Sequence, residues 1–157
     1  EHNGPVYIRL SRMNVPEIYD ENYTLDINKA VTLKEGKDVS VFVTGDLLAE
    51  VMKANEILKA KGIDAEIINI PVIKPLDCGT IINSVNKTGL AVTVENHSII
   101  GGLGSAVCET LSENAPHKVL RIGINDTFGQ SGTPNELLKH YGLDAESIAN
   151  KIIELKK

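Results

Sequence analysis

The sequence predicts an α/β protein with a mainly parallel sheet that is covered by helices on both faces. Four short apolar runs, rich in β-branched residues, have the length of buried strands. They span residues 39–43, 65–70, 90–94 and 118–124. A segment of helical periodicity follows each run, and this alternation implies right-handed crossovers between parallel strands.

Composition and length are typical of a globular domain. The chain has 157 residues, of which 42% are hydrophobic and 24% are charged, and its formal net charge is −5. That acidic balance, with two phenylalanines and no tryptophan for base stacking, argues against a nucleic-acid partner. Since no apolar run could span a bilayer and no signal peptide is recognisable, we expect a cytoplasmic protein without a membrane partner. From the absence of an initiator methionine we expect a fragment of a longer protein.

The first thirty residues differ in character from the rest of the chain. Residues 5–10 are predicted to form a strand, and a polar connection with little periodicity continues to about residue 30. Residues 31–35 then alternate between apolar and polar side chains, as an edge strand does. Residues 1–30 are therefore expected to be the end of another structural unit, and residues 31–157 to form the α/β unit.

Local signals place the helices between the strands. The first predicted helix ends at Gly62, whereas Asp77 and Asp144 cap the second and the last. A capping box from Thr133 to Glu136 predicts a helix over residues 134–141. The first helix is predicted to bury Leu47, Val51, Ala54 and Leu58, and the second Cys78, Ile81, Ile82 and Val85. The third is predicted to bury Leu103, Ala106, Val107 and Leu111, and the last Ile148, Ile152 and Leu155.

The pattern of residues 90–111 predicts a strand, a glycine-rich loop and a helix. In open α/β sheets, ligands bind at the carboxyl ends of strands, and Glu95, Asn96 and His97 lie where this strand should end. Glu95 and His97 would point the same way if the strand continued. Two ligands without a third or fourth do not make a zinc site, so we interpret both as satisfied, interfacial side chains.

The loop glycines Gly101, Gly102 and Gly104 can adopt positive φ or allow close backbone approach. Gly102-x-Gly104-x-x-Val107, with Asp126 at the end of the next strand, is close to a dinucleotide-binding fingerprint. Val107 replaces the third glycine, and this is the third βα step rather than the first. We therefore prefer a tight turn, with a stand-alone nucleotide-binding module as the alternative.

Other candidate residues have ordinary explanations. Ser131 lies in a Gly-x-Ser-Gly-Thr segment before a capped helix, so we expect a loop residue rather than a nucleophile. Arg9 and Arg12 stand at and just beyond the end of a predicted strand, where a guanidinium could hold a phosphate, although pairing with a surface carboxylate is the alternative. Cys78 and Cys108 are each assigned to an apolar helix face, so we expect two buried free thiols rather than a disulfide or a metal site.

Four motifs extend over nearly the whole chain: Leu10-Ser-Arg12-x-Asn14, Val72-Ile-Lys-Pro75-Leu-Asp77, Val94-Glu95-Asn-His-Ser-Ile-Ile-Gly101-Gly-Leu-Gly104-Ser, and Phe128-Gly-Gln-Ser-Gly-Thr133-Pro-x-Glu-Leu-Leu. With these motifs the chain resembles the C-terminal end of transketolase. Residues 1–30 resemble the final strand of its pyrimidine-binding domain with a linker, and residues 31–157 its C-terminal domain. The last three motifs also resemble 1-deoxyxylulose-5-phosphate synthase and, more loosely, the beta subunits of 2-oxo acid dehydrogenases. The first motif favours transketolase, because the synthase usually has Tyr-Pro-Arg-Gly there.

The resemblance implies a three-layer α/β/α sandwich with a mainly parallel five-stranded sheet and one antiparallel edge strand. It also implies a transferase of the pentose phosphate pathway that moves a two-carbon ketol unit from a ketose phosphate to an aldose phosphate. Such enzymes hold thiamine diphosphate and a divalent metal (Mg²⁺) between a diphosphate-binding and a pyrimidine-binding domain. Those domains, or a subunit that carries them, would be the partners of this chain, together with sugar phosphates.

The same resemblance suggests one substrate contact and one assembly role. Arg12 matches the family arginine that binds the sugar phosphate, whereas Arg9, three residues away, should face elsewhere. We expect no catalytic residue, no metal ligand, no bound cofactor and no activity in this chain alone. The loop from Glu95 to Gly104 is interpreted as an interface or structural loop, because the resemblance implies that this domain lies at the contacts of a homodimer. A purely architectural domain remains an alternative.

Overall fold

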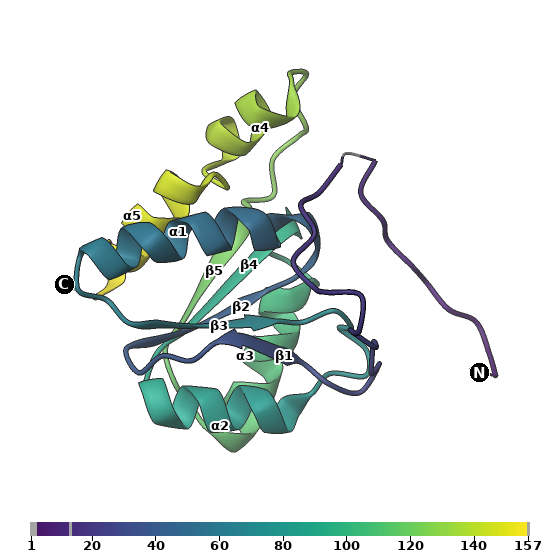
Figure 1. Cartoon of the computed structure of the whole chain (residues 1–157), viewed down its shortest axis with the longest axis vertical. Helices are drawn as coiled ribbons and strands as arrows, with labels where there is room; N and C mark the ends of the chain where they lie inside the picture. The colour runs from purple at the N-terminus through teal and green to yellow at the C-terminus, as the bar shows by residue number, and fades with distance from the viewer. Residues whose placement is uncertain (1–2, 13, 157) are drawn as a thin grey trace.

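The computed structural model describes residues 3–12 and 14–156, and it confirms the three-layer α/β sandwich (Figure 1). The elements are β1 (Val31–Lys34), β2 (Val39–Val43), the 3₁₀ turn η1 (Gly45–Leu47), α1 (Leu48–Ala60), β3 (Ala65–Asn69), α2 (Cys78–Thr88), β4 (Ala91–Ser98), α3 (Leu103–Asn114), β5 (Val119–Ile124), α4 (Pro134–Tyr141) and α5 (Ala145–Leu155). Within the described ranges, no helix has both the length and the apolar character required to cross a membrane.

The five strands form one sheet in the order β1-β3-β2-β4-β5. β1 pairs antiparallel with β3, and the other three pairs are parallel. The mainly parallel five-stranded sheet with one antiparallel edge strand is thus confirmed. All five residues of the central strand β2 are buried, which explains why its sequence is a continuous apolar run instead of an alternating one.

Two apolar cores lie on the two faces of the sheet. Val41 and Val92 point into the core under α1 and α5, whereas Phe42 and Ile68 point into the core under α2 and α3. Val41 and Phe42 are neighbours in β2 and face opposite sides, as successive strand residues must. Figure 1 shows α1 and α5 above the sheet and α2 and α3 below it.

The predicted helix caps are confirmed. Asp77 and Asp144 each accept the backbone N–H three residues further on, at 3.1 Å. The capping box from Thr133 to Glu136 is present at the start of α4, and Gly142 ends that helix in the left-handed conformation. These caps satisfy backbone groups that a helix end leaves without an internal partner.

Two details of the helices differ from prediction. Cys78 is the first residue of α2 and is exposed, so its predicted burial is wrong: the buried face of that helix begins one turn later, at Ile81. Cys108 is half-buried rather than buried, because α3 turns it toward the sheet edge instead of the core centre. Both cysteines are free thiols, as expected.

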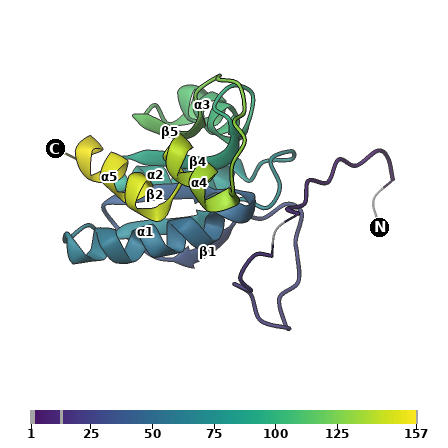
Figure 2. The same cartoon turned by 90° about the horizontal axis from the view of Figure 1, so that it is seen from above.

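The strand predicted over residues 5–10 is absent. Residues 3–12 are extended and exposed, and toward the N-terminus the segment projects away from the α/β unit in both views (Figures 1 and 2). A strand needs a neighbour to satisfy its backbone N–H and C=O groups, and no strand of the sheet lies beside this segment. Large apolar side chains are nevertheless displayed on it: Val6, Tyr7, Ile8 and Leu10 are 62%, 88%, 71% and 82% exposed.

Candidate functional site

The loop at the carboxyl end of β4 is organised around one buried carboxylate. β4 continues four residues beyond the predicted end, to Ser98, and places Glu95 inside the protein, where it is 1% exposed. The two carboxylate oxygens accept the backbone N–H groups of Leu103 and Gly104, each at 2.8 Å. Glu95 therefore caps α3 from eight residues away, and its negative charge lies at the positive end of the helix dipole.

Gly102 and Gly104 are required by this arrangement. Gly102 precedes the helix and has no side chain to cap it; a Cβ there would lie 1.9 Å from Oε2 of Glu95. A Cβ on Gly104 would lie 2.9 Å from Cδ of Arg121 and from Oγ1 of Thr93. The two glycines thus allow the carboxylate and the neighbouring strand to approach the helix, which matches the tight-turn interpretation.

The tip of the loop is held by further hydrogen bonds. Gly101 adopts a positive φ of 76°, and its N–H donates to Oγ of Ser105 at 2.8 Å. The Arg121 guanidinium, which the sequence analysis did not single out, donates to the carbonyl of Ile99 at 2.9 Å. The backbone at the tip is therefore fixed from both α3 and β5.

His97 lies on the solvent side of Glu95. Its side chain is 50% exposed, and Nδ1 is 2.7 Å from the carbonyl oxygen of Ser98 and 3.9 Å from Oε2 of Glu95. Because a carbonyl can only accept, Nδ1 carries a proton, and Nε2 is left for another contact. Within the described ranges, no three His, Cys, Asp or Glu side chains are grouped as metal ligands.

The glycine loop does not fit a diphosphate. A nucleotide or cofactor diphosphate at a helix N-terminus needs free N–H groups, and the N–H groups of Leu103 and Gly104 already donate to Glu95. A second anion there would also be repelled by the buried carboxylate. Asp126, the acidic residue of the proposed fingerprint, is exposed in the loop after β5. The dinucleotide alternative therefore lacks structural support, and so does thiamine diphosphate binding at this loop.

The two candidate arginines have different positions. The guanidinium of Arg9 donates to the backbone carbonyl of Asn96 at 2.7 Å and so connects the N-terminal segment to the end of β4. The Asn96 side-chain amide is 3.2 Å from a carboxylate oxygen of Asp46. Arg12 is exposed on the extended segment. Sequence reasoning did not find the Arg9 contact, because it joins residues 87 positions apart.

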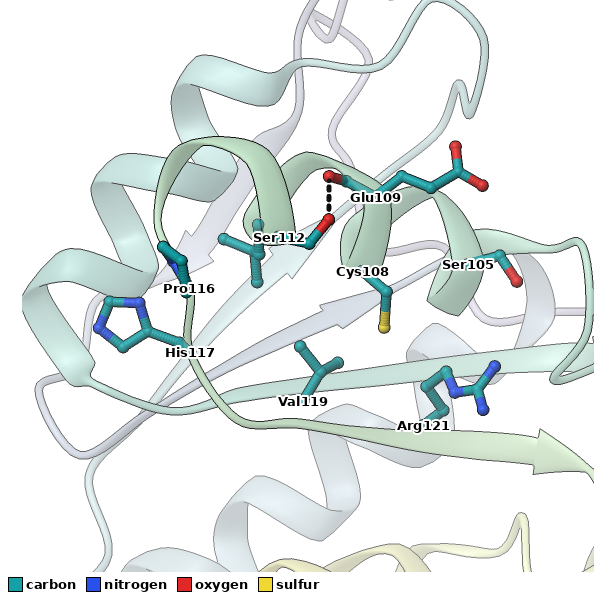
Figure 3. A pocket seen from close by; sticks show the side chains of 9 residues that line it. Ser105, Cys108, Glu109, Ser112, Pro116, His117, Val119 and Arg121 are labelled. Atoms are coloured by element: carbon teal, nitrogen blue, oxygen red, sulfur yellow. Dashed lines mark hydrogen bonds between the residues drawn. The ribbon is translucent and has the colours of Figure 1, made fainter.

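A groove of about 670 Å³ lies between α3 and the edge strand β5 (Figure 3). Cys108 of α3 points toward Val119 and Arg121 of β5 across it. One nitrogen of the Arg121 guanidinium is already used in the bond to Ile99, as described above. Ser131, which we expected in a loop, is exposed between β5 and α4.

Comparison with known proteins identifies the family of this chain. Residues 28–148 match the family model for the transketolase C-terminal domain. A putative transketolase C-terminal section from Methanocaldococcus jannaschii is 49% identical, over 100% of this chain and 50% of that protein. The 6-deoxy-6-sulfo-D-fructose transketolase subunit SqwH of a Clostridium species is 44% identical, over 99% and 49%.

A solved structure gives the same result. It is described as a split-gene transketolase in an inactive beta4 tetramer, and it matches with a TM-score of 0.87 and 41% identity over 93% of this chain and 49% of its own. The chain belongs to the transketolase C-terminal domain family. It spans about half the length of the curated relatives it matches.

The role of Gly102 as space for Glu95 can be tested by replacing Gly102 with alanine. Gly102 has φ −102°, which alanine tolerates, so the only new cost is the clash of Cβ with the carboxylate. We expect the free energy of unfolding to fall by about 3 kcal/mol, the value of one or two hydrogen bonds to a charged group. Chemical denaturation measures this value.

Gly129→Ala is the matched control, because a Cβ at Gly129 meets nothing within 4 Å. Equal stability of the two variants would show that the carboxylate can move aside freely and that the cap is not required.

Proposed function

We propose that this chain is the C-terminal part of a thiamine-diphosphate-dependent transketolase, which transfers a two-carbon ketol unit from a ketose phosphate to an aldose phosphate. The observation that carries the proposal is 49% identity to a putative transketolase C-terminal section along the entire chain, including the first thirty residues. In this proposal thiamine diphosphate and Mg²⁺ are held by the diphosphate-binding and pyrimidine-binding parts of the enzyme. The cytoplasmic location stays a prediction.

The exposed N-terminal segment supports a division at about residue 30. Residues 3–12 carry apolar side chains that no part of the α/β unit covers, although the sequence has the character of a strand. Apolar exposure of this kind indicates a partner surface. We propose that this segment completes the sheet of a pyrimidine-binding domain, and that residues 31–157 form the C-terminal domain.

The structural relative also bears on whether this chain can act alone. That relative is described as an inactive tetramer of beta chains. By analogy, this chain is inactive until it is joined with the domains, or with the subunit, that hold the cofactor.

Arg12 is our proposed ligand for the phosphate of the sugar substrate. It matches the family arginine with that role, and it is exposed on the segment that we place against the pyrimidine-binding domain. Its planar guanidinium can hold two oxygens of a phosphate or a sulfonate. The sulfonate matters because one relative is described as a 6-deoxy-6-sulfo-D-fructose transketolase subunit.

In the assembled enzyme, we expect Arg12→Ala to raise the KM for xylulose 5-phosphate and ribose 5-phosphate by at least tenfold. A hydrogen bond to a charged group contributes about 1.5–3 kcal/mol, and each 1.4 kcal/mol is tenfold in binding. Steady-state kinetics with phosphorylated and unphosphorylated sugars measure the change, which should be confined to the phosphorylated ones. Arg9→Ala is the control, because Arg9 donates to Asn96 instead. Equal losses with both kinds of sugar would show that Arg12 has a structural role.

We further propose that the tip of the glycine loop contacts another subunit in a homodimer or a larger homo-oligomer. Its buried part is saturated by Glu95, but the tip displays Ile100, which is 60% exposed, beside the half-exposed His97. An exposed apolar side chain next to a histidine with an available Nε2 is suited to a protein interface. The loop would then serve assembly rather than chemistry.

This assembly role predicts that Ile100→Asp and His97→Ala weaken self-association several-fold without lowering the melting temperature. A charge at Ile100 would have to be desolvated in the interface, whereas in the single chain it faces water. Sedimentation velocity over a concentration series measures the association. Asn86→Ala, on the exposed face of α2, is the control. Unchanged association together with loss of turnover per assembled enzyme would contradict the assembly role.

A further inference from the structure

The connection from Asn14 to Lys29 is fastened to the α/β unit by the side chain of Tyr19. Among the described residues between 3 and 29, Tyr19 and Tyr23 are the two whose side chains are not exposed. Their rings stack with centroids 3.9 Å apart and an interplanar angle of 20°. The hydroxyl oxygen of Tyr19 accepts a hydrogen bond from Nδ2 of Asn69 at 2.7 Å.

Asn69 is a rigid support for this contact. It is the last residue of β3, it is 7% exposed, and it pairs with Val31 of β1 on one side and Val43 of β2 on the other. Burial raises the pKa of Tyr19, while the hydrogen bond from Asn69 partly opposes that rise. The ring is thus partly withdrawn from water against the end of the sheet.

The connection also has local structure of its own. The carboxylate of Asp20 accepts the N–H of Asn22 at 2.9 Å, and the carbonyl of Asp20 accepts the N–H of Tyr23 at 3.1 Å. This turn brings Tyr23 back onto Tyr19. A second turn of the same kind, at Asp26, follows before the chain enters the domain.

We propose that Tyr19, Tyr23 and Asn69 form a clasp that positions Arg12 for the sugar phosphate; the inference rests on the phosphate-binding role proposed above. Arg12 lies between two fixed points: Arg9, three positions before it, donates to the carbonyl of Asn96 at 2.7 Å, and Tyr19, seven positions after it, is held by Asn69. With the clasp open, the fixed point on the C-terminal side moves to Ala30, eighteen positions after Arg12, whose N–H donates to Asp77 at 3.0 Å. The stretch that holds Arg12 from that side then lengthens from about 25 Å to about 60 Å at full extension. In this proposal the three clasp residues act through Arg12 and are positioning residues.

Limited proteolysis of the 157-residue chain tests the clasp directly. A glutamate-specific protease can cleave after Glu17 and Glu21, which flank Tyr19 and are exposed, but it needs an extended segment around the bond. We expect Tyr19→Ala to be cleaved about tenfold faster than the unaltered chain, because ring stacking and the hydrogen bond to Asn69 are both lost. Tyr19→Phe keeps the stacking and should lie in between. The melting temperature should stay unchanged, since the connection lies outside both cores.

Tyr7→Ala is the matched control, because Tyr7 lies in the same N-terminal stretch and is 88% exposed. Cleavage of Tyr19→Ala no faster than that of Tyr7→Ala would overturn the clasp.

The positioning role is tested in the assembled enzyme. We expect Tyr19→Ala to raise the KM for phosphorylated sugars several-fold while kcat at saturation stays within twofold, with Arg12→Ala assayed in parallel. A raised KM in Arg12→Ala without one in Tyr19→Ala would overturn the positioning role and leave the phosphate ligand intact. No rise in Arg12→Ala would instead remove the proposed function on which the clasp depends.

Discussion

The carboxylate of Glu95 holds together the end of β4, the glycine loop and the start of α3. It accepts the first two N–H groups of the helix at 2.8 Å each, in a site that excludes water. A buried carboxylate without such donors would be costly, and a buried helix start without an acceptor would be costly too. Because the two needs meet in one contact, Gly102 must lack a side chain.

This contact changes what the carboxyl edge of the sheet can do. In many open α/β sheets the N–H groups at this place bind a ligand phosphate, with the strand order opening a crevice there. Here a carboxylate of the chain itself occupies them. The exposed tip at Ile100 and the N-terminal connection fastened at Tyr19 lie outside this contact.

Sequence patterns predicted most of the helices and strands, because the residues that define each element lie close together in the sequence. The caps at Asp77 and Asp144 depend on residues three positions away, and strand burial follows from continuous apolar runs. The tight-turn interpretation of Gly102 was also available, since the fingerprint lacked its third glycine.

What the sequence did not reveal depends on contacts between distant residues. The strand expected at residues 5–10 lacks a partner in the sheet, which no local pattern can show. The cap of α3 by Glu95 and the bond from Asn69 to Tyr19 join positions eight and fifty residues apart. Nothing in the spacing of those residues identifies them in advance.

Isothermal titration calorimetry on the 157-residue chain tests most directly whether Glu95 replaces a ligand at the start of α3. Thiamine diphosphate with Mg²⁺, and separately NAD⁺, would be titrated into the chain and into Glu95→Gln, which removes the charge but keeps one acceptor oxygen. The account predicts no saturable heat with the unaltered chain for either ligand. Saturable binding by the unaltered chain that is lost when Gly102 is replaced by alanine would contradict it, because the loop would then be a diphosphate site.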